Sequence, residues 1–267
     1  MKIKFPKIKK INEIKKFFNN KQLHDLVKKS EIKSKSYPSL KKRNTPYKPE
    51  LFDLYMLYQY IVLNKRTTIL EFGSGWSSLI FVKALNELKK KFSQDVQKLR
   101  RQNPFELFIL ENEIKYLDKS KKRIENYYLN KKSNLVKIHY NYSEVYMSEF
   151  QNRIVTKYKK IPLCNPDFIY LDGPDQSQIK SNVSGINIKH NDFMPMVSDI
   201  LKIEYFLLPG TIIVVDGRGA NAKFLKDHFK RKWNYIYKKD LDQHIFVLAD
   251  PPIGKLNEKQ IMFYNSK

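Results

Sequence analysis

The stretch "TTILEFGSGWSSLIFVKAL", residues 67–85, joins a short apolar run to a helix-like segment through a turn with two glycines. The run at 67–72 is rich in β-branched and aromatic residues, which is typical of a buried parallel strand. Gly73 and Gly75 let a ligand approach the backbone, and the free N–H groups of the following helix favour an anionic group. Glu71 adds a carboxylate at the same turn. The stretch therefore predicts a ligand-binding strand, turn and helix.

Further apolar runs of the same kind follow at intervals, and charged periodic stretches separate them. The runs are 105–111, 135–140, 167–172 and 211–216. The stretches expected to be helical are 77–102, 113–131, 145–158 and 193–208. This alternation predicts an α/β protein with a doubly wound, Rossmann-like sheet that is mostly parallel.

The flanks of this repeat complete the predicted domain. A helix is expected at 49–65, before the first strand, and another at 219–233, after the last parallel strand. The segments 233–239 and 243–250 are strand-like and are joined by the short polar "DLD", so they predict an antiparallel C-terminal hairpin at one edge of the sheet.

Residues 1–46 differ from the rest of the chain and predict a basic helical extension and linker before a domain at 47–267. Apolar residues recur there at intervals of three and four among many lysines, which indicates one or two amphipathic helices. Such a helix is compatible with peripheral contact with an anionic membrane or substrate. The alternative is that it packs across the main domain. Three prolines within 36–50 indicate the connector.

Composition limits the setting in which the protein works. The chain has 267 residues and one cysteine, Cys164, which leaves no internal disulfide and no thiolate cluster for a metal. No apolar run approaches the ~18–20 residues of a membrane span, and lysines interrupt the N-terminal region where a signal peptide would be apolar. We therefore expect a cytoplasmic protein without a transmembrane segment.

The net charge of +24 raises the question of a nucleic-acid partner. Only 8 of the 51 basic residues are arginines, and the lysines are spread through nearly every segment. That distribution favours a generally lysine-coated surface over a binding stripe. Nucleic acid therefore stays the less favoured partner, behind a small-molecule or glycan acceptor.

The turn after the first strand decides between two ligands. A dinucleotide would find Ser78 at the third glycine position and Glu71 close to its pyrophosphate, which fits poorly. The amino acid end of S-adenosylmethionine has an ammonium, a carboxylate and a cationic centre, and it fits better. With Glu71, Gly73 and Gly75 matching the motif E-x-G-x-G, the sequence resembles the class I S-adenosylmethionine-dependent methyltransferases over about residues 50–250.

The resemblance implies a set of cofactor-binding residues. Glu71 would hold the methionine ammonium, and Glu111, at the end of the second strand, would accept the ribose hydroxyls, with Glu113 as the alternative. The long interval to Glu111 is explained by an extended helix through 77–102. Asn141 or Ser143 would lie near the adenine, with Tyr140 or Tyr142 stacking. The full predicted set is Glu71, Gly73, Ser74, Gly75, Trp76, Ser77, Glu111, Asn141 and Asp172.

The acceptor is expected beyond the carboxyl ends of the strands. The stretches there contain three candidates for a general base, His190, Asp192 and His244. They also contain Asp216 and Arg218, which are expected to position the acceptor. The segments "DILKIEYFLLPGTIIVVDGRGANAKFL" (199–225) and "DQHIF" (242–246) are similar to bacterial methyltransferases of the kind that tailor small molecules and surface polysaccharides. The resemblance implies O-methylation of a hydroxyl. The alternatives are a nucleic-acid methyltransferase, RNA above all, and a basic binding module without catalysis.

Metal-dependent O-methyltransferases have an aspartate after the fourth strand and an Asp-Asn pair after the fifth. Asp172 and Asp216 match the aspartates, but Gly217 replaces the asparagine and Arg218 follows it, so we expect no metal. Arg218 could instead clamp an acidic acceptor. Each aspartate could also simply cap a turn, and His190 and His244 could each be a surface or structural histidine.

Overall fold

The computed structural model describes residues 3–31, 48–128, 136–176, 179, 181–188 and 195–266. Its elements are α1 (Ile11–Asn20), α2 (His24–Ser30), α3 (Leu51–Leu63), β1 (Thr68–Phe72), α4 (Trp76–Gln97), β2 (Glu106–Glu111), α5 (Ile114–Tyr128), β3 (Lys137–Tyr142), β4 (Val145–Phe150), β5 (Arg153–Tyr158), β6 (Phe168–Leu171), β7 (Met196–Val197), α6 (Asp199–Ile203), η3 (Glu204–Phe206), β8 (Ile212–Asp216), α7 (Gly219–His228), β9 (Trp233–Lys238), η4 (Lys239–Leu241), β10 (Gln243–Leu248) and α8 (Lys255–Asn265).

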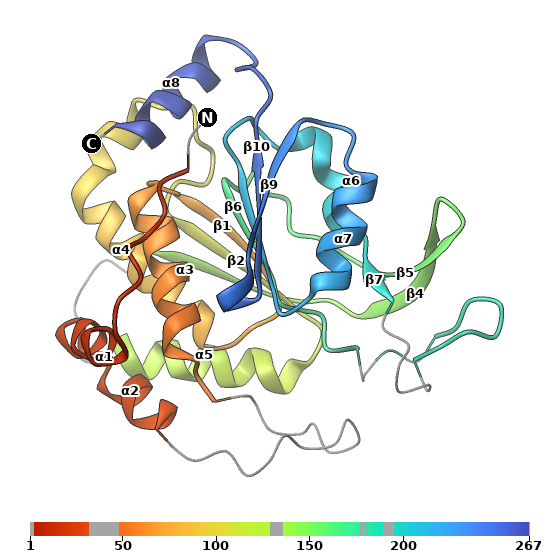
Figure 1. Ribbon diagram of the computed structural model, residues 1–267, viewed down its shortest axis with the longest axis horizontal. Coiled ribbons are helices and arrows are strands. Elements are labelled where there is room, and N and C mark those ends of the chain that lie inside the picture. The colour runs from red at the N-terminus through yellow and green to blue at the C-terminus, as the bar shows by residue number, and fades with distance from the viewer. Residues whose placement is uncertain are drawn as a thin grey trace.

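A seven-stranded sheet in the order β3-β2-β1-β6-β8-β10-β9 forms the middle layer (Figure 1). The first five strands of that order run parallel, and β10 runs antiparallel to both β8 and β9. Helices α3, α4 and α5 cover one face, and α6 and α7 cover the other. The predicted Rossmann-like sheet with an antiparallel C-terminal hairpin is confirmed.

Burial on both faces explains why β1 is an almost uninterrupted apolar run in the sequence. All five residues of β1 are buried, because β2 and β6 pair with it on either side and helices cover both of its faces. Alternate side chains of a strand point to opposite faces. Ile69 accordingly belongs to the hydrophobic core under α3 and α4, and Leu70 to the core under α6 and α7.

The segment 145–158, expected to be helical, is a β-hairpin, so that prediction was wrong. β4 and β5 pair antiparallel, and β7 adds a third strand beside β5. The turn residues Gln151 and Asn152 both have positive φ, 48° and 60°. Two such residues form a tight reversal whose twist suits a hairpin. The charged residues at 149, 153 and 157 are four positions apart, a spacing that also suits a helix, which explains the wrong prediction.

Other differences concern the C-terminal half. The helix expected at 193–208 is limited to α6 and η3 within the described residues. α7 ends at His228 rather than continuing to 233, because the next N–H groups, of Lys230 and Arg231, donate to the buried carboxylate of Glu204. A helix that was not expected, α8, closes the chain. The Tyr264 hydroxyl fixes it by donating to Asp167 at 3.0 Å.

Helices α1 and α2 pack against the main domain. Ile14 and Phe18 of α1 are fully buried in the core shared with α3 and α4, and Phe17 makes an edge contact with Tyr55 at 5.1 Å. The apolar face of α1 therefore meets protein rather than a membrane, as the alternative interpretation had it. The predicted boundary at residues 46 and 47 lies outside the described residues.

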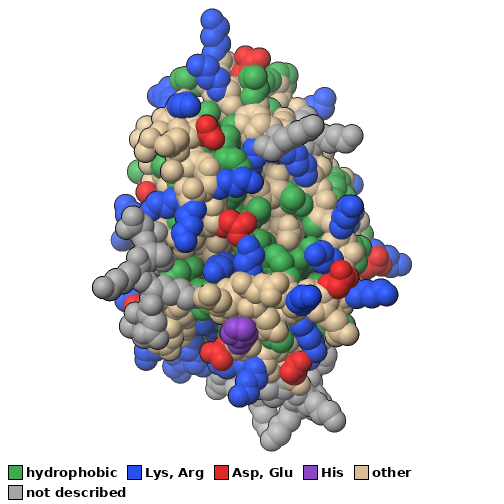
Figure 2. Space-filling model, turned by 90° about the vertical axis from the view of Figure 1, so that its left-hand side faces the viewer, with side chains coloured by type: hydrophobic (Ala, Val, Ile, Leu, Met, Phe, Trp, Pro, Cys, Tyr) green, Lys and Arg blue, Asp and Glu red, His purple; other side chains and the backbone are tan. Residues whose placement is uncertain are grey.

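The surface agrees with a dispersed positive charge. Figure 2 shows Lys and Arg side chains scattered over one face, with Asp and Glu between them, and no continuous basic stripe there. In the part of the chain that the structure describes, no helix is both long and apolar enough to cross a membrane.

Candidate functional site

The glycine turn between β1 and α4 lies against the loop that follows β6. Gly73 has φ +101°, and a Cβ at this position would lie 3.0 Å from the nitrogen of Gly173. A Cβ on Gly173 would in turn lie 2.6 Å from the nitrogen of Gly73. The Phe72 carbonyl accepts hydrogen bonds from the N–H groups of Asp172 and Gly173. Only glycines allow these two loops to meet at the carboxyl edge of the sheet.

Glu71 lies beneath this turn and is 1% exposed. Its two carboxylate oxygens accept hydrogen bonds from the Ser77 and Ser78 hydroxyls, at 2.5 and 2.7 Å. Burial raises the pKa of Glu71 to about 8, against the effect of these two hydrogen bonds. In this structure Glu71 therefore holds the first turn of α4. Its predicted contact with a cofactor ammonium requires one of these oxygens to accept a further hydrogen bond.

Glu111, the ribose candidate, ends β2 beside the same turn. One of its oxygens accepts from the Ser74 hydroxyl at 2.8 Å, and the other accepts from the N–H groups of Asn112 and Glu113. Burial raises its pKa to about 7. The long α4 explains the interval between turn and acid, as expected. Ser74 and Glu111, two of the predicted cofactor-binding residues, are therefore in direct contact.

Trp76, at the start of α4, has two cations over its ring that the sequence did not indicate. The Arg123 guanidinium lies over its ring at 4.2 Å, and Lys29 of α2 lies over it at 5.5 Å. Arg123 also donates to the Gly75 carbonyl at 2.8 Å, and burial lowers its pKa to about 10. Sequence spacing carries no signal for this contact, because α5 and α4 meet only in the tertiary structure.

The adenine candidates on β3 are partly engaged with the backbone. The Asn141 amide donates to the carbonyls of Ile109 and His139, each at 3.0 Å. Ser143 is buried and accepts from the Lys160 N–H at 2.9 Å. Tyr142, one of the two candidates for stacking, is 49% exposed. The role of Asn141 stays a prediction.

The loop after β6 crosses over β1 and reaches the end of β2. The side chain of Asn112 donates to the Asp175 carbonyl and accepts from the Asp175 N–H, at 2.8 and 2.9 Å. Arg218 holds the same loop by donating to the carbonyls of Asp172 and Pro174, at 2.9 and 2.8 Å. Two of the five N–H donors of Arg218 are thus used on backbone carbonyls, and its role as a clamp for an acidic acceptor stays a prediction.

Asp172 and Asp216 end neighbouring strands. Asp172 is exposed to solvent, yet enclosure by the surrounding protein raises its pKa, and the charge of Arg218 acts in the opposite direction. Asp216 accepts a hydrogen bond from the Tyr170 hydroxyl at 2.7 Å. Burial, followed by the charge of Asp53, raises the pKa of Asp216 to about 8. Asp53, in the first turn of α3, was missed because it lies more than 100 residues away in sequence.

The predicted catalytic residues do not all come together. His244 and the neighbouring Val215 lie on the α7 side of the sheet, whereas Asp216 points toward α3. The Nδ1 atom of His244 is 2.8 Å from the Tyr235 hydroxyl, and burial lowers the pKa of His244. His190 and Asp192 lie outside the described residues. The structure therefore separates His244 from Asp216 by the thickness of the sheet.

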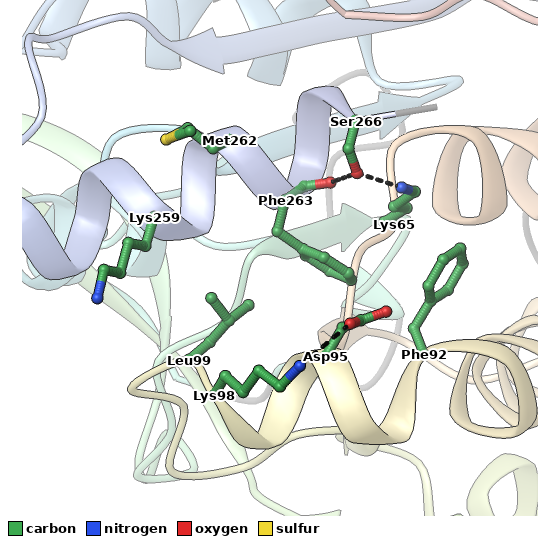
Figure 3. Close-up of a pocket in the computed structure, with 9 residues that line it drawn as sticks. All are labelled: Lys65, Phe92, Asp95, Lys98, Leu99, Lys259, Met262, Phe263 and Ser266. Carbon is green, nitrogen blue, oxygen red and sulfur yellow. Dashed lines mark hydrogen bonds and ion pairs between the residues drawn. The ribbon is translucent and has the colours of Figure 1, made fainter.

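Two further features bear on ligand binding. Among the residues that the structure describes, no three His, Cys, Asp or Glu side chains are arranged to hold a metal ion. A pocket between α4 and α8 is lined by lysines and aromatic rings, including Lys65, Phe92 and Phe263 (Figure 3). Lys65 precedes β1, so this pocket lies at the amino end of the strands, opposite the glycine turn.

Comparisons with known proteins agree with the fold only in outline. No protein-family model matches the chain, and no curated protein matches it. Similar solved structures include the O-methyltransferase TomG from Streptomyces achromogenes with SAM, at 12% identity and a TM-score of 0.37, covering 92% of each chain. An O-methyltransferase from Bacillus cereus with SAH has 13% identity and a TM-score of 0.41, covering 91% of this chain and 93% of that one.

A Staphylococcus aureus protein assigned as a caffeoyl-CoA O-methyltransferase has 12% identity and a TM-score of 0.41, with the same coverage of 91% and 93%. Scores of this size do not establish a shared function. The fold assignment therefore rests on the strand order and on the glycine turn described above.

Proposed function

We propose that the protein is an S-adenosylmethionine-dependent methyltransferase. The observation that carries this proposal is the glycine turn, where Gly73 adjoins Gly173 while Glu71 and Glu111 lie beneath and beside it. The backbone room, the helix N-terminus and the two carboxylates suit a ligand with an ammonium, a carboxylate and ribose hydroxyls. These residues would hold S-adenosylmethionine, which supplies a methyl group on a sulfonium.

We further propose that the acceptor atom is a hydroxyl oxygen of a small molecule or glycan. Methyl transfer requires alignment of the acceptor, and a positioned base adds perhaps 10²- to 10⁴-fold. Asp216, at the carboxyl edge of the sheet, would position the acceptor. His190, Asp192 and His244 are the candidates for the base.

Calorimetry with the purified protein tests the cofactor. We expect micromolar binding of S-adenosylmethionine or S-adenosylhomocysteine and at least tenfold weaker binding by Glu71→Gln, because the amide loses the charge and the turn of α4 loosens. Glu258→Gln is the matched control, since Glu258 is exposed on α8, away from the glycine turn. Binding of a nicotinamide dinucleotide in place of both methionine-derived ligands would contradict the proposal.

Incubating cell extracts with methyl-labelled cofactor tests the acceptor. We expect label in a small O-methylated product. Label in structured RNA, persisting at physiological salt, would support an RNA methyltransferase instead. Label on a nitrogen would leave the cofactor assignment intact but would show that the acceptor atom is not a hydroxyl oxygen.

A further inference from the structure

Three carboxylates meet at the carboxyl edge of the sheet beneath α3. Asp172 follows β6 and Asp216 ends β8, and these strands are paired with Leu171 opposite Val215, so the two acids lie side by side. Asp53 comes from the first turn of α3. Burial raises the pKa of Asp53 to about 7, and the charges of Glu50 and then Asp172 contribute. We call Asp53, Asp172 and Asp216 the acidic cluster.

Among the described residues, the acidic cluster has no ion-pair partner. In the described part of the chain, none of its three carboxylates forms an ion pair with a lysine, arginine or histidine. Arg218 is near enough to influence Asp172, but its guanidinium donates to backbone carbonyls. On a chain of net charge +24, three adjacent acids without a cation are notable, because placing them together costs free energy.

A buried hydroxyl provides a second, independent observation. Tyr60, two turns after Asp53 on α3, is fully buried, and its hydroxyl makes no hydrogen bond. Helical side chains lean toward the N-terminus of their helix, which directs Tyr60 toward the acidic cluster, and its hydroxyl is influenced by the charges of Asp216 and Asp53. Leaving such a hydroxyl unpaired costs ~1–3 kcal/mol, so the site lacks a hydrogen-bonding partner.

Neighbouring side chains add oxygen acceptors to the same place. The Tyr170 hydroxyl donates to Asp216, which leaves its lone pairs available. Gln243 pairs in register with Asp216 and is fully buried, and its amide is close enough to Asp216 to lower the pKa of that acid. Carboxylate, phenol and amide oxygens around one point are suited to a group with several N–H donors and a positive charge.

We propose that the acidic cluster binds a protonated amino group carried by the methyl acceptor. This inference rests on the proposed function. It gives the acceptor a chemical class: a compound with a basic nitrogen at some distance from the atom that is methylated. Glu71, the predicted partner of the cofactor's own ammonium, lies on β1, two strands from Asp216 on β8. At ~4.8 Å between strands, roughly 10 Å separate the two positions, which is room for a second ligand.

Matched probes that differ only in charge test the proposal. Phenyl, 4-hydroxyphenyl and 3-indolyl rings would each carry a 2-aminoethyl, a 2-hydroxyethyl or a carboxymethyl tail. Their affinities for the protein, saturated with S-adenosylhomocysteine, are measured by ligand-observed NMR at about pH 8.5, where the amines are still protonated and the carboxylates ionised. We expect the amine of at least one ring to bind about tenfold or more tightly than its alcohol, and the carboxylate to bind most weakly.

Single substitutions test whether the acidic cluster causes the preference for amines over alcohols. Asp53→Asn and Asp216→Asn should each reduce the amine-to-alcohol ratio to about twofold or less, and Tyr60→Phe should reduce it in part. Asp240→Asn is the matched control: it removes one negative charge from an exposed position near the hairpin and should leave the ratio unchanged.

Several results would overturn the inference. They are a ratio near one in the unmodified protein, a ratio that survives both asparagine variants, no binding by any amine, or displacement of the amines by millimolar magnesium, which would indicate a metal site. Repeating the titrations without S-adenosylhomocysteine separates the two proposals. A protein that prefers amines but binds no cofactor would remove the proposed function and keep the acidic cluster as an amine site.

Discussion

At the scale of single residues, backbone contact explains the glycines of the turn. Gly73 and Gly173 come from loops a hundred residues apart, and a side chain on either would meet backbone atoms of the other. Gly254 has a similar positive φ, 116° against 101° for Gly73, but it has open space around its Cβ direction. The two glycines therefore have similar φ but differ in contact, which allows a comparison.

We expect Gly73→Ala to lower the free energy of unfolding more than Gly254→Ala does. Both substitutions carry the cost of left-handed backbone, ~1–2 kcal/mol, but only Gly73→Ala adds overpacking, typically ~1–3 kcal/mol. Urea unfolding measures the difference, and calorimetry should show weaker cofactor binding by Gly73→Ala alone. Equal losses in the two variants would mean that the two loops do not press on each other.

At the scale of elements, two parts of the chain take their structure from their surroundings. The β4–β5 hairpin depends on Gln151 and Asn152, neither of which is the glycine that favours positive φ. The α1–α2 segment depends on burying its apolar face against α3. We therefore expect substitutions in the hairpin turn and in α1 to change the free energy of unfolding.

The hairpin turn is open to improvement. Replacing Gln151 and Asn152 together by Asn-Gly should raise the free energy of unfolding by ~0.5–1 kcal/mol, because the new pair adopts positive φ more readily. Gln151→Pro should destabilise the protein, since proline cannot reach φ of 48°. Denaturant titration checks both. A stabilising Gln151→Pro would be incompatible with the turn described here.

The packing of α1 can be tested by truncating one buried ring. Phe18→Ala should cost ~3–5 kcal/mol, as expected for a large side chain in a core, because Phe18 is fully buried. Ile8→Ala is the control, since Ile8 is 71% exposed, and it should change stability by less than ~0.5 kcal/mol. If Phe18→Ala left the main unfolding transition unchanged, α1 would not belong to the core of the domain.

At the scale of the whole molecule, the unusual feature is a group of buried acids inside a strongly basic protein. Glu71 and Asp216 have pKa values raised to about 8, and Asp53 and Glu111 to about 7, in each case chiefly by burial. In the unfolded chain such groups ionise near pH 4. Between these limits the folded protein holds protons that the unfolded chain has released, so its stability falls as pH rises.

We therefore expect thermal stability to fall between about pH 5 and 8, with the loss ending once the buried acids are ionised. One such group contributes at most ~1.4 kcal/mol per pH unit. Asp216→Asn keeps the shape and the Tyr170 contact but removes the titration, so its stability should depend less steeply on pH than that of the unmodified protein. Asp240→Asn should retain the original slope. If stability fell equally steeply with pH in all three proteins, Asp216 would be ionised over this range in both the folded and the unfolded state.

The sequence by itself determined the sheet, because parallel strands covered on both faces must be short apolar runs, and five such runs stand in order from 67 to 216. The glycine turn and the antiparallel hairpin were predictable for the same local reason. The hairpin at 145–158 was not, since its alternation is weak and its turn lacks glycine. Only tertiary structure decided which polar groups share a site. Asp53 joins Asp216, and Arg123 covers Trp76, through the packing of α3 and α5, and the sheet separates His244 from Asp216 because neighbouring residues of a strand face opposite ways.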